Sequence, residues 1–332
     1  MMAPIHATRD GSYYHGRSDE LLAGALGRRL AGRVQLIMTS PPFPLNHKKS
    51  YDNLQGEAYV AWIQSQASLW SDLLTDDGSL VIEIGNAWEP GRPVQSLLPL
   101  KSLLSLVEHP TAGLRLCQEF VCYNPARFPS PAQWVTVERA RVTDAYTHVW
   151  WLAKTDHPKA DNSAVLRPYS NDMRRLLERR DFNRGERPSG FKVREDAFSR
   201  DNGGSIAHNL FELEPMSERR EVRLPNAFAL ANTGSNDFYS RTCRERGMRR
   251  HPARMPAGMA AFFVEFLTDR NDLVLDPFAG SNTTGYVAEL LGRRWVGIEA
   301  DEQYAAHSAL RFEDPLLAEA ARARTAQASN PQ

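Results

Sequence analysis

The sequence predicts an α/β fold with a doubly wound, mostly parallel β-sheet. Short apolar runs alternate along the chain with longer segments of helical spacing, which is the pattern of strands joined by crossover helices. Two of these runs, at residues 34–38 and 273–276, stop abruptly at turns rich in small residues and proline. The 332 residues, 42% of them apolar, suffice for one large core and an appended region.

The first half of the chain contains a regular series of expected elements after a polar segment at residues 1–12. A short strand and turn at 12–16 precede a helix for which Ser18 is the expected N-cap. The run at 34–38 is expected to be a buried strand. The other predicted elements are an amphipathic helix carrying Tyr59, Ile63, Leu69 and Leu73, a turn at 76–79, strands at 80–85, 119–123 and 147–154, and a helix at 94–108.

The last third continues this alternation. A helix at 257–268 precedes a strand at 273–276, and a turn at 277–285 leads into a helix at 286–291 and a strand at 294–299. A strand, a tight turn of small residues and a helix N-terminus together let a ligand approach backbone amides closely. We therefore expect a ligand-binding turn after residue 276.

An acidic residue at the end of the last predicted strand supports the expectation of a ligand-binding turn. Glu299 ends the last strand, 23 residues after Asp276, and an acid about 20 residues beyond such a turn can bind ribose hydroxyls. Asn282 stands where a dinucleotide-binding turn has its second glycine, and the segment lacks the Gly-Lys-Ser/Thr of a phosphate-binding loop. The alternative reading is a purely structural turn of small residues.

The run at 34–38 continues through Thr39 into Ser40-Pro41-Pro42-Phe43. Each proline fixes φ near −65° and disfavours helix at the preceding residue, so the chain should leave the sheet in a stiff extended turn. Such a turn can hold an amino group between two acceptors, Ser40 Oγ and the Pro41 carbonyl, beside the Phe43 ring. The alternative is an ordinary Pro-Pro strand exit with a capping serine.

Charge is unevenly distributed, although the formal net charge is zero. Residues 154–254 hold 21 Lys and Arg against 15 Asp and Glu, a net charge of +6, which leaves the rest of the chain at −6. A basic segment attracts phosphates, and arginine can also read guanine edges. Arginines on a solvated helix are the ordinary alternative. Because the segment lies between two halves of the expected sheet domain, we favour an inserted nucleic-acid recognition region.

Composition excludes several other classes. Cys117, Cys122 and Cys243 form neither a disulfide framework nor a C-x-x-C metal pair, so we expect reduced core residues and no metal site. No apolar run approaches the roughly 18 residues of a membrane span, and the N-terminus lacks the charged-then-apolar order of a signal peptide. We expect a soluble, cytoplasmic protein without a membrane partner.

Together these motifs resemble those of the β group of amino DNA methyltransferases, over about residues 12–314. The resemblance rests on the segments 39–43, 48–49, 201–206, 251–254 and 280–285. It implies a class I methyltransferase fold with a circularly permuted motif order. The implied domains are a catalytic half at 1–154, an inserted DNA target-recognition region at 155–250, a cofactor-binding half at 251–314 and a C-terminal tail at 315–332.

The resemblance also implies an activity. A methyl group would pass from S-adenosylmethionine directly to the exocyclic N4 of a flipped cytosine in double-stranded DNA, for restriction-modification or epigenetic marking. Serine at the first motif position is typical of cytosine N4 enzymes, and no covalent intermediate is needed, which fits the absence of a Pro-Cys nucleophile. A cognate restriction endonuclease that acts separately is a further partner that this activity allows.

The implied site residues fall into three groups. The catalytic turn is Ser40, Pro41, Pro42 and Phe43. The cofactor-binding residues are Asp276, Pro277, Phe278, Gly280, Ser281, Asn282, Thr283, Glu299, His251 and Pro252. The DNA-binding residues are Lys48, Lys49, Arg184, Arg187, Lys192, Arg194, Arg200, Arg241, Arg244, Arg249 and Arg250.

Three alternatives stay open at this stage. An adenine N6 methyltransferase shares the architecture but more often has aspartate in place of Ser40. A nicotinamide-dependent oxidoreductase would also use a sheet turn and a ribose acid, without needing the Ser-Pro-Pro-Phe turn or the basic insert. A non-catalytic DNA-binding protein could keep the fold. Two residues have no assigned role: Arg17, where the family usually has aspartate, and Glu83, a candidate for the cleft because a buried carboxylate is costly unless paired.

Overall fold

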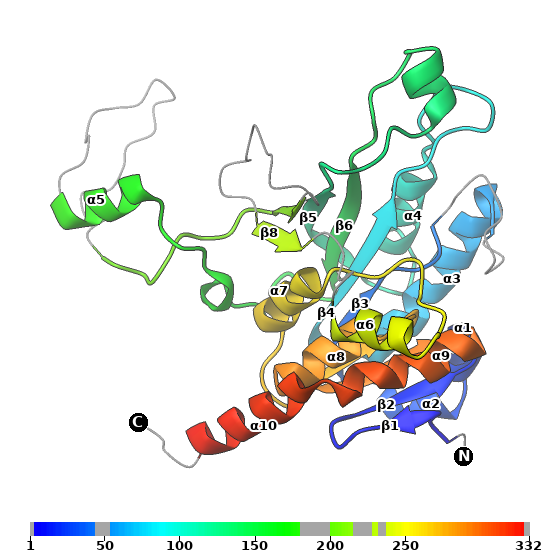
Figure 1. The fold of residues 1–332 in the computed structure, drawn as a ribbon. Helices are drawn as coiled ribbons and strands as arrows, with labels where there is room; N and C mark the ends of the chain where they lie inside the picture. The colour runs from blue at the N-terminus through cyan, green and yellow to red at the C-terminus, as the bar shows by residue number, and fades with distance from the viewer. Residues whose placement is uncertain (1–2, 44–53, 180–199, 215–227, 232–236, 329–332) are drawn as a thin grey trace.

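The computed structural model describes residues 3–43, 54–179, 200–214, 228–231 and 237–328. They form one ten-stranded sheet in the order β1-β2-β10-β9-β3-β4-β6-β5-β7-β8 (Figure 1). The strands are β1 (His6–Ala7), β2 (Gly11–His15), β3 (Val34–Thr39), β4 (Leu74–Gly85), β5 (Arg115–Tyr123), β6 (Tyr146–Ala153), β7 (Leu210–Glu214), β8 (Phe228–Ala231), β9 (Leu273–Asp276) and β10 (Arg294–Glu299).

Most neighbouring strands are parallel. The run β2, β10, β9, β3 and β4 is parallel throughout, whereas β6 is antiparallel to both β4 and β5. The predicted doubly wound, mostly parallel sheet is therefore confirmed. None of the helices in the described ranges is long and apolar enough to cross a membrane.

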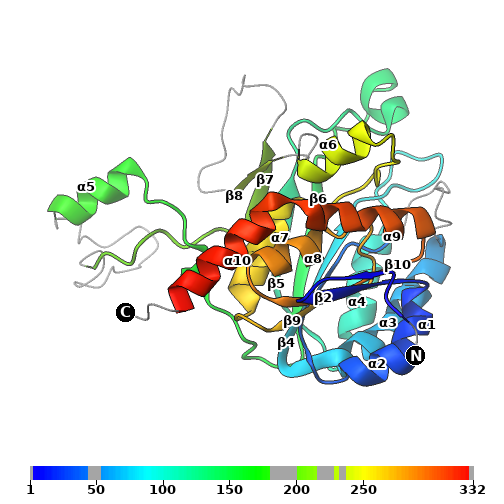
Figure 2. The ribbon, with the colours of Figure 1, turned by 60° about the horizontal axis from the view of Figure 1, so that its bottom comes forward.

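Helices cover both faces of this sheet (Figures 1 and 2). The described helices are α1 (Ser18–Ala23), α2 (Ala25–Leu30), α3 (Gly56–Leu73), α4 (Leu98–Val107), α5 (Asn171–Arg179), α6 (Phe238–Glu245), α7 (Ala257–Leu267), α8 (Thr283–Leu290), α9 (Glu302–Ser308) and α10 (Pro315–Ala328), with short helical turns η1 (Gln133–Val137), η2 (Asn162–Val165) and η3 (Ala309–Glu313).

The strand β3 shows why the sheet needs two helical layers. Leu36 and Met38 enter the core under α7 and α8, whereas Ile37 enters the core under α1 to α4. Alternate residues of a strand point to opposite faces, so a strand covered on both sides reads as a continuous apolar run. All six residues of β3 are buried, which confirms the predicted buried strand.

Pairing between β3 and β9 joins the two halves of the chain. Leu36 lies opposite Val274 and Ile37 opposite Leu275, in parallel register. The segments that leave these strands, after Thr39 and after Asp276, therefore emerge side by side at one edge of the sheet. This juxtaposition makes the permuted motif order compatible with a single site, because ligands bind at the carboxyl ends of the strands in open α/β sheets.

Several predicted boundaries were wrong. Ser18 is the first residue of α1 and not its cap, because extended Arg17 holds the cap position and its guanidinium pairs with Asp19 and Glu20. The expected turn at 76–79 belongs to β4, which accommodates it through an irregular step in its pairing with β3.

Other elements differ in length. The helix expected at 94–108 begins only at Leu98, because Gln95 forms a bridge with Trp88 and Pro99 suits a first helical turn. The helix expected from 286 begins at Thr283, where Asn282 caps it.

The expected target-recognition region, residues 155–250, is divided between the sheet and the outside of the molecule. Strand β7 pairs with β5, and its Phe211 is fully buried against Phe120, Phe262 and Phe263. Helix α5, in contrast, lies apart from the sheet in both views (Figures 1 and 2). Strand β8 pairs with β7 in the same sheet, so the part of this region that is available for recognition excludes both strands.

Candidate active site

The two predicted turns line one cavity of about 800 Å³ at the carboxyl ends of the central strands. Residues 40–43 come from the β3 exit and 276–281 from the β9 exit, while Glu299 comes from the end of β10. His251 and Pro252, which precede α7, also line the cavity. Residues that are more than 200 positions apart in the sequence therefore share one site.

The β3 turn is held against the neighbouring strand. Pro41 is buried, and Ser40, Pro42 and Phe43 are partly exposed toward the cavity. A Cβ atom on Gly85 of β4 would lie 2.6 Å from two atoms of the Phe43 ring, so glycine is what lets this ring lie against the strand. Phe43 thus has a fixed support on one side.

Glu83 of β4 is the polar partner of this turn. Its carboxylate accepts a hydrogen bond from Thr147 Oγ1 at 2.9 Å, and the Ser40 side chain also hydrogen-bonds to it. Burial raises the pKa of Glu83, while these two bonds and the nearby Arg127 lower it in part. The sequence makes Glu83 a candidate for the cleft, and the structure places it in the cavity beside Ser40.

Asp276 connects three elements at the base of the second turn. It accepts hydrogen bonds from Thr39 Oγ1 at 2.9 Å, Thr284 Oγ1 at 2.7 Å and the Phe278 amide at 3.1 Å. Burial raises the pKa of Asp276 to about 6, against the opposite effect of these bonds. With its oxygens engaged in this way, Asp276 fixes the shape of the turn.

Asn282 has a conformational reason to replace glycine. Its φ of 57° and ψ of 44° are left-handed, a region that asparagine tolerates better than most residues. Its side-chain oxygen accepts from the Gly285 amide at 3.1 Å and caps α8. The departure from a glycine pattern, seen in the sequence, therefore preserves the turn and adds a cap.

Glu299 touches the same turn from the adjacent strand. Its two carboxylate oxygens accept from the Gly280 amide at 2.9 Å and from the Asp301 amide at 2.8 Å. Burial raises its pKa, and the charge of Asp301 adds to this effect. A carboxylate has about four acceptor positions, so the group can still accept hydrogen bonds from a ligand in the cavity.

A buried arginine holds the β9 turn in place through hydrogen bonds. Arg311, 5% exposed, donates to the Ser281 carbonyl at 2.6 Å, to Ser281 Oγ at 3.0 Å and to Asp237 at 3.3 Å. On the other side, the Tyr13 hydroxyl donates to the Gly280 carbonyl at 2.7 Å. Sequence reasoning missed both residues, since neither belongs to a local motif.

His251 lies directly against the turn. A Cβ atom on Gly280, which has a φ of +51°, would lie 3.0 Å from the His251 ring. The same ring meets Tyr304 edge-on, with 4.5 Å between centroids, and burial lowers its pKa. Glycine at this position therefore serves both the left-handed backbone and the close approach of the histidine.

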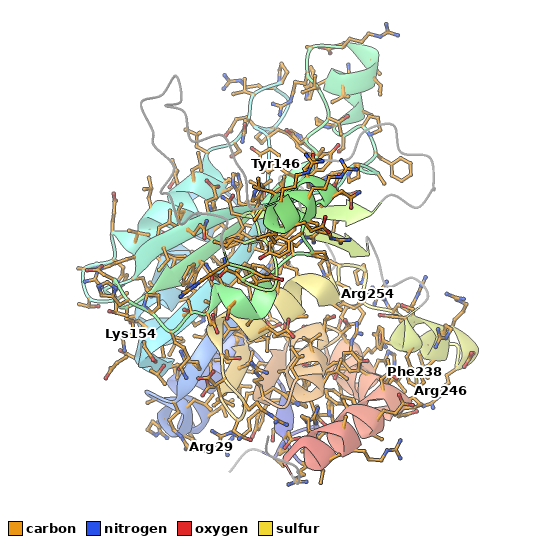
Figure 3. The ribbon with its side chains drawn as sticks, turned by 90° about the vertical axis from the view of Figure 1, so that its left-hand side faces the viewer. Arg29, Tyr146, Lys154, Phe238, Arg246 and Arg254 are labelled. Carbon is orange, nitrogen blue, oxygen red and sulfur yellow. The ribbon has the colours of Figure 1, made fainter. Side chains whose placement is uncertain are left out.

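The predicted DNA-binding residues are only partly described. Arg241, Arg244, Arg249 and Arg250 are exposed on α6 and the segment after it. In Figure 3 this helix lies below and to the right of Arg254, which lines the cavity. Arg200 is exposed at the edge of a described range. The remaining residues, Lys48, Lys49, Arg184, Arg187, Lys192 and Arg194, lie outside the described residues.

The cavity also contains residues that sequence reasoning did not select. Asn124, Arg127 and Thr147 come from the segment between β5 and β6 and from β6, and Tyr304 comes from α9. The only sequence signal for the first two is a proline-rich crossing between strands, which does not indicate chemistry. Among the described residues, no group of three or more His, Cys, Asp or Glu side chains could hold a metal ion.

Comparison with known proteins places these features in a family. The pattern of the family described as DNA methylase matches residues 34–310. The Type II methyltransferase M.PvuII of Proteus hauseri is 39% identical over 318 residues, which are 95% of this chain and 88% of that protein. The Type II methyltransferase M2.DpnII of Streptococcus pneumoniae is 42% identical over 60 residues, 18% of this chain and 22% of that protein.

Solved structures agree with the sequence matches. The PvuII DNA methyltransferase (cytosine-N4-specific) superposes with a TM-score of 0.68 at 32% identity, covering 96% of this chain and 93% of that one. The M1.HpyAVI–SAM complex superposes with a TM-score of 0.51 at 15% identity, covering 92% of this chain and 100% of that one. The second likeness shows a shared fold.

Proposed function

The chain belongs to the DNA methylase family, and from this premise we propose that it methylates the exocyclic N4 of cytosine in double-stranded DNA, with S-adenosylmethionine as donor. The observation that carries this proposal is the position of the Ser40–Phe43 turn in the same cavity as the β9 turn and Glu299. The names of the related proteins, a Type II methyltransferase and a cytosine-N4-specific enzyme, support the choice of substrate.

The residues at the β9 turn fit the donor. S-adenosylmethionine supplies an electrophilic methyl group on a sulfonium. Glu299 would accept the ribose hydroxyls, because its carboxylate keeps acceptor positions beyond the two backbone amides it already binds. His251, Pro252, residues 277–281 and Thr283 would form the walls, whereas the fully buried Asn282 lies behind them as the cap of α8. A cavity of about 800 Å³ has room for a ligand of this size.

The β3 turn would position the amine. The nitrogen lone pair of a cytosine amine is delocalised into the ring, which makes it a poor nucleophile. Ser40 Oγ and the Pro41 carbonyl would accept its two hydrogens and favour a pyramidal nitrogen with its lone pair directed at the methyl group. The stiffness of the Pro-Pro turn keeps these acceptors in place. Alignment of this kind can contribute roughly 7–11 kcal/mol to lowering the barrier.

Glu83 would accept the proton that methyl transfer releases from the amine. The methylated amine must lose a proton, which can pass to Ser40 Oγ while the Ser40 hydroxyl proton passes to the Glu83 carboxylate. The hydrogen bond between Ser40 and Glu83 already links these groups. Because burial raises the pKa of Glu83, its carboxylate is a better proton acceptor than an exposed one.

The target base must leave the duplex to reach this cavity. Phe43, supported by Gly85, would stack on the extruded cytosine. We assign residues 155–250, apart from the sheet strands β7 and β8, to target recognition, together with Lys48 and Lys49. A separately acting restriction endonuclease and a cytoplasmic location belong to the same proposal, since a modification enzyme of this type works where the DNA is.

The test is product identification. The purified protein is incubated with labelled S-adenosylmethionine and unmethylated bacteriophage DNA, and the DNA is digested to nucleosides for mass analysis. N4-methylcytosine is the expected product. N6-methyladenine would instead assign the related adenine activity, and no labelled nucleoside at all would favour a non-catalytic DNA-binding protein.

A further inference from the structure

The segment between β5 and β6, residues 124–145, forms an arm at the rim of the cavity. Figure 3 shows it rising above Tyr146, away from α6, so that Arg254 lies between the arm and that helix. Asn124 and Arg127 at its base line the cavity with Ser40 and Glu83. The arm is therefore continuous with the site proposed for the target base.

Hydrogen bonds hold the arm in a defined shape. The Asn124 amide donates to the Ala145 carbonyl at 2.7 Å and closes its base. Higher up, the Ala140 amide donates to the Trp134 carbonyl at 2.8 Å, and the side chain of Arg141 donates to the Pro93 carbonyl at 3.3 Å. A side chain on this arm is thus presented from a fixed support.

The Phe128 side chain on this arm is exposed and is not part of the hydrophobic core. It is 87% exposed, the highest value among the large hydrophobic side chains of the described residues. Its predecessor Arg127 points to the cavity and donates to the Tyr146 carbonyl at 3.4 Å. A single exposed apolar side chain is common on a protein surface. What distinguishes Phe128 is that it directly follows Arg127, which lines the cavity.

We propose that the arm is a second DNA-contacting surface and that Phe128 enters the base stack beside the extruded cytosine. This inference rests on the proposed function. Extrusion of a base leaves a gap in the stack, and apolar side chains can insert between base steps as wedges. The arm carries Arg127, Arg139 and Arg141 against Glu138 and Asp144, a net charge of +1. Arg141 pairs with Asp144, which leaves the exposed Arg139 and the cavity-lining Arg127 to meet phosphates.

The experiment compares two forms of one duplex. The position that the wild-type enzyme methylates is first mapped by sequencing of bacteriophage DNA. A short duplex containing that position is then made in matched form and with an abasic site opposite the target cytosine, which leaves the target unpaired. Methyl transfer is measured for the wild type, Phe128→Ala, Phe128→Trp and Val142→Ala. Val142 is the matched control, since it lies on the same arm and is 86% exposed.

Phe128→Ala is expected to lower kcat/KM at least about tenfold on the matched duplex. On the abasic duplex the decrease should be less than about threefold, because an unpaired target cytosine leaves the stack at a lower cost and depends less on the inserted ring. Phe128→Trp should retain most activity, and Val142→Ala should stay within about twofold of wild type on both. The dissociation constant of S-adenosylmethionine should not change in any variant.

Three results would overturn the inference. Phe128→Ala could leave the matched duplex unaffected, or reduce both duplexes equally. It could also abolish self-association in sedimentation while methylation stays normal, which would assign the ring to a contact between copies of the chain. A wild-type protein that methylates no DNA would reject the proposed function itself, and this inference with it.

Discussion

The turns after β9 and β3 lie at the same sheet edge but are held in different ways. Side chains from separate elements bind the β9 turn: the buried Tyr13 from β2 and Arg311 from η3, and the partly exposed Glu299 from β10. The β3 turn owes its shape to two consecutive prolines and to the packing of Phe43 on Gly85, with Glu83 as a polar partner.

This difference matches what each turn has to do. A turn that binds a ligand through its backbone must keep one shape, so many long-range contacts specify it. A turn that presents acceptors to a reacting amine needs those acceptors stiff but available, and prolines supply stiffness without using hydrogen bonds. Changes around the β9 turn should therefore act on stability and cofactor affinity, and changes around the β3 turn on turnover.

The largest effect is expected from Arg311→Met. The substitution leaves the Ser281 carbonyl and one side of Asp237 without their buried donor, which should cost about 3–5 kcal/mol of unfolding free energy. Urea denaturation measures this loss. Arg246→Met, which removes a surface pair with Glu313, is the control and should change stability little. Similar stability of both variants would contradict the bracing role.

Asp276 should make stability fall as pH rises. Burial raises its pKa from 3.8 to about 6, so the folded protein binds this proton more tightly than the unfolded chain. The resulting stabilisation is complete below pH 4 and is lost between about pH 4 and 6, a change of roughly 3 kcal/mol. Urea denaturation across this range should show the decline in wild type relative to Asp276→Asn. Parallel pH profiles for both proteins would refute it.

Ser40→Ala tests the β3 turn. Loss of the hydroxyl removes one acceptor from the amine and the link to Glu83, so turnover should fall by ~10²-fold or more. The dissociation constant of S-adenosylmethionine should stay near wild type, because the β9 turn is untouched. Single-turnover methylation and calorimetry give the two quantities. Normal turnover would remove Ser40 from the mechanism.

Gly85→Ala should displace Phe43 without altering any polar group. The new methyl group would meet the ring at 2.6 Å, so the ring must move from its support. We expect capture of the target base to weaken by about 1–3 kcal/mol, seen as a higher KM for DNA. Phe43→Ala should show the same change. If Gly85→Ala binds DNA normally while Phe43→Ala does not, the ring tolerates the displacement.

The smallest effect is expected from Glu299→Gln. The amide removes the negative charge and keeps one oxygen, so one of the two backbone amides, that of Gly280 or that of Asp301, keeps its acceptor and the other loses it. S-adenosylmethionine should bind about tenfold more weakly, since a hydrogen bond to a charged acceptor is lost. Calorimetric titration measures this, with DNA affinity as the control. Unchanged cofactor binding would move the ribose contact to another residue.

Local patterns in the sequence predicted the central elements of the fold. Strands β3, β9 and β10 appeared as apolar runs bounded by turn residues, and α7 appeared one residue too long. The boundaries that failed depend on pairing with distant residues. Residues 76–79 look like a turn, but they lie within β4, at an irregular step between the pairing of Leu74 with Val34 and that of Ser79 with Leu36. Strand β7 was missed because its few residues lie in a segment dominated by charge.

The sequence by itself determined the fold class and the two turns of the site, because prolines, small residues and apolar runs act on their immediate neighbours. Only the tertiary structure decided what supports these turns. Thr39 meets Asp276 across 237 positions, and Tyr13 meets Gly280 across 267. Such contacts follow from the pairing of β3 with β9 and from packing on both faces of the sheet, and they leave no periodic signal in the chain.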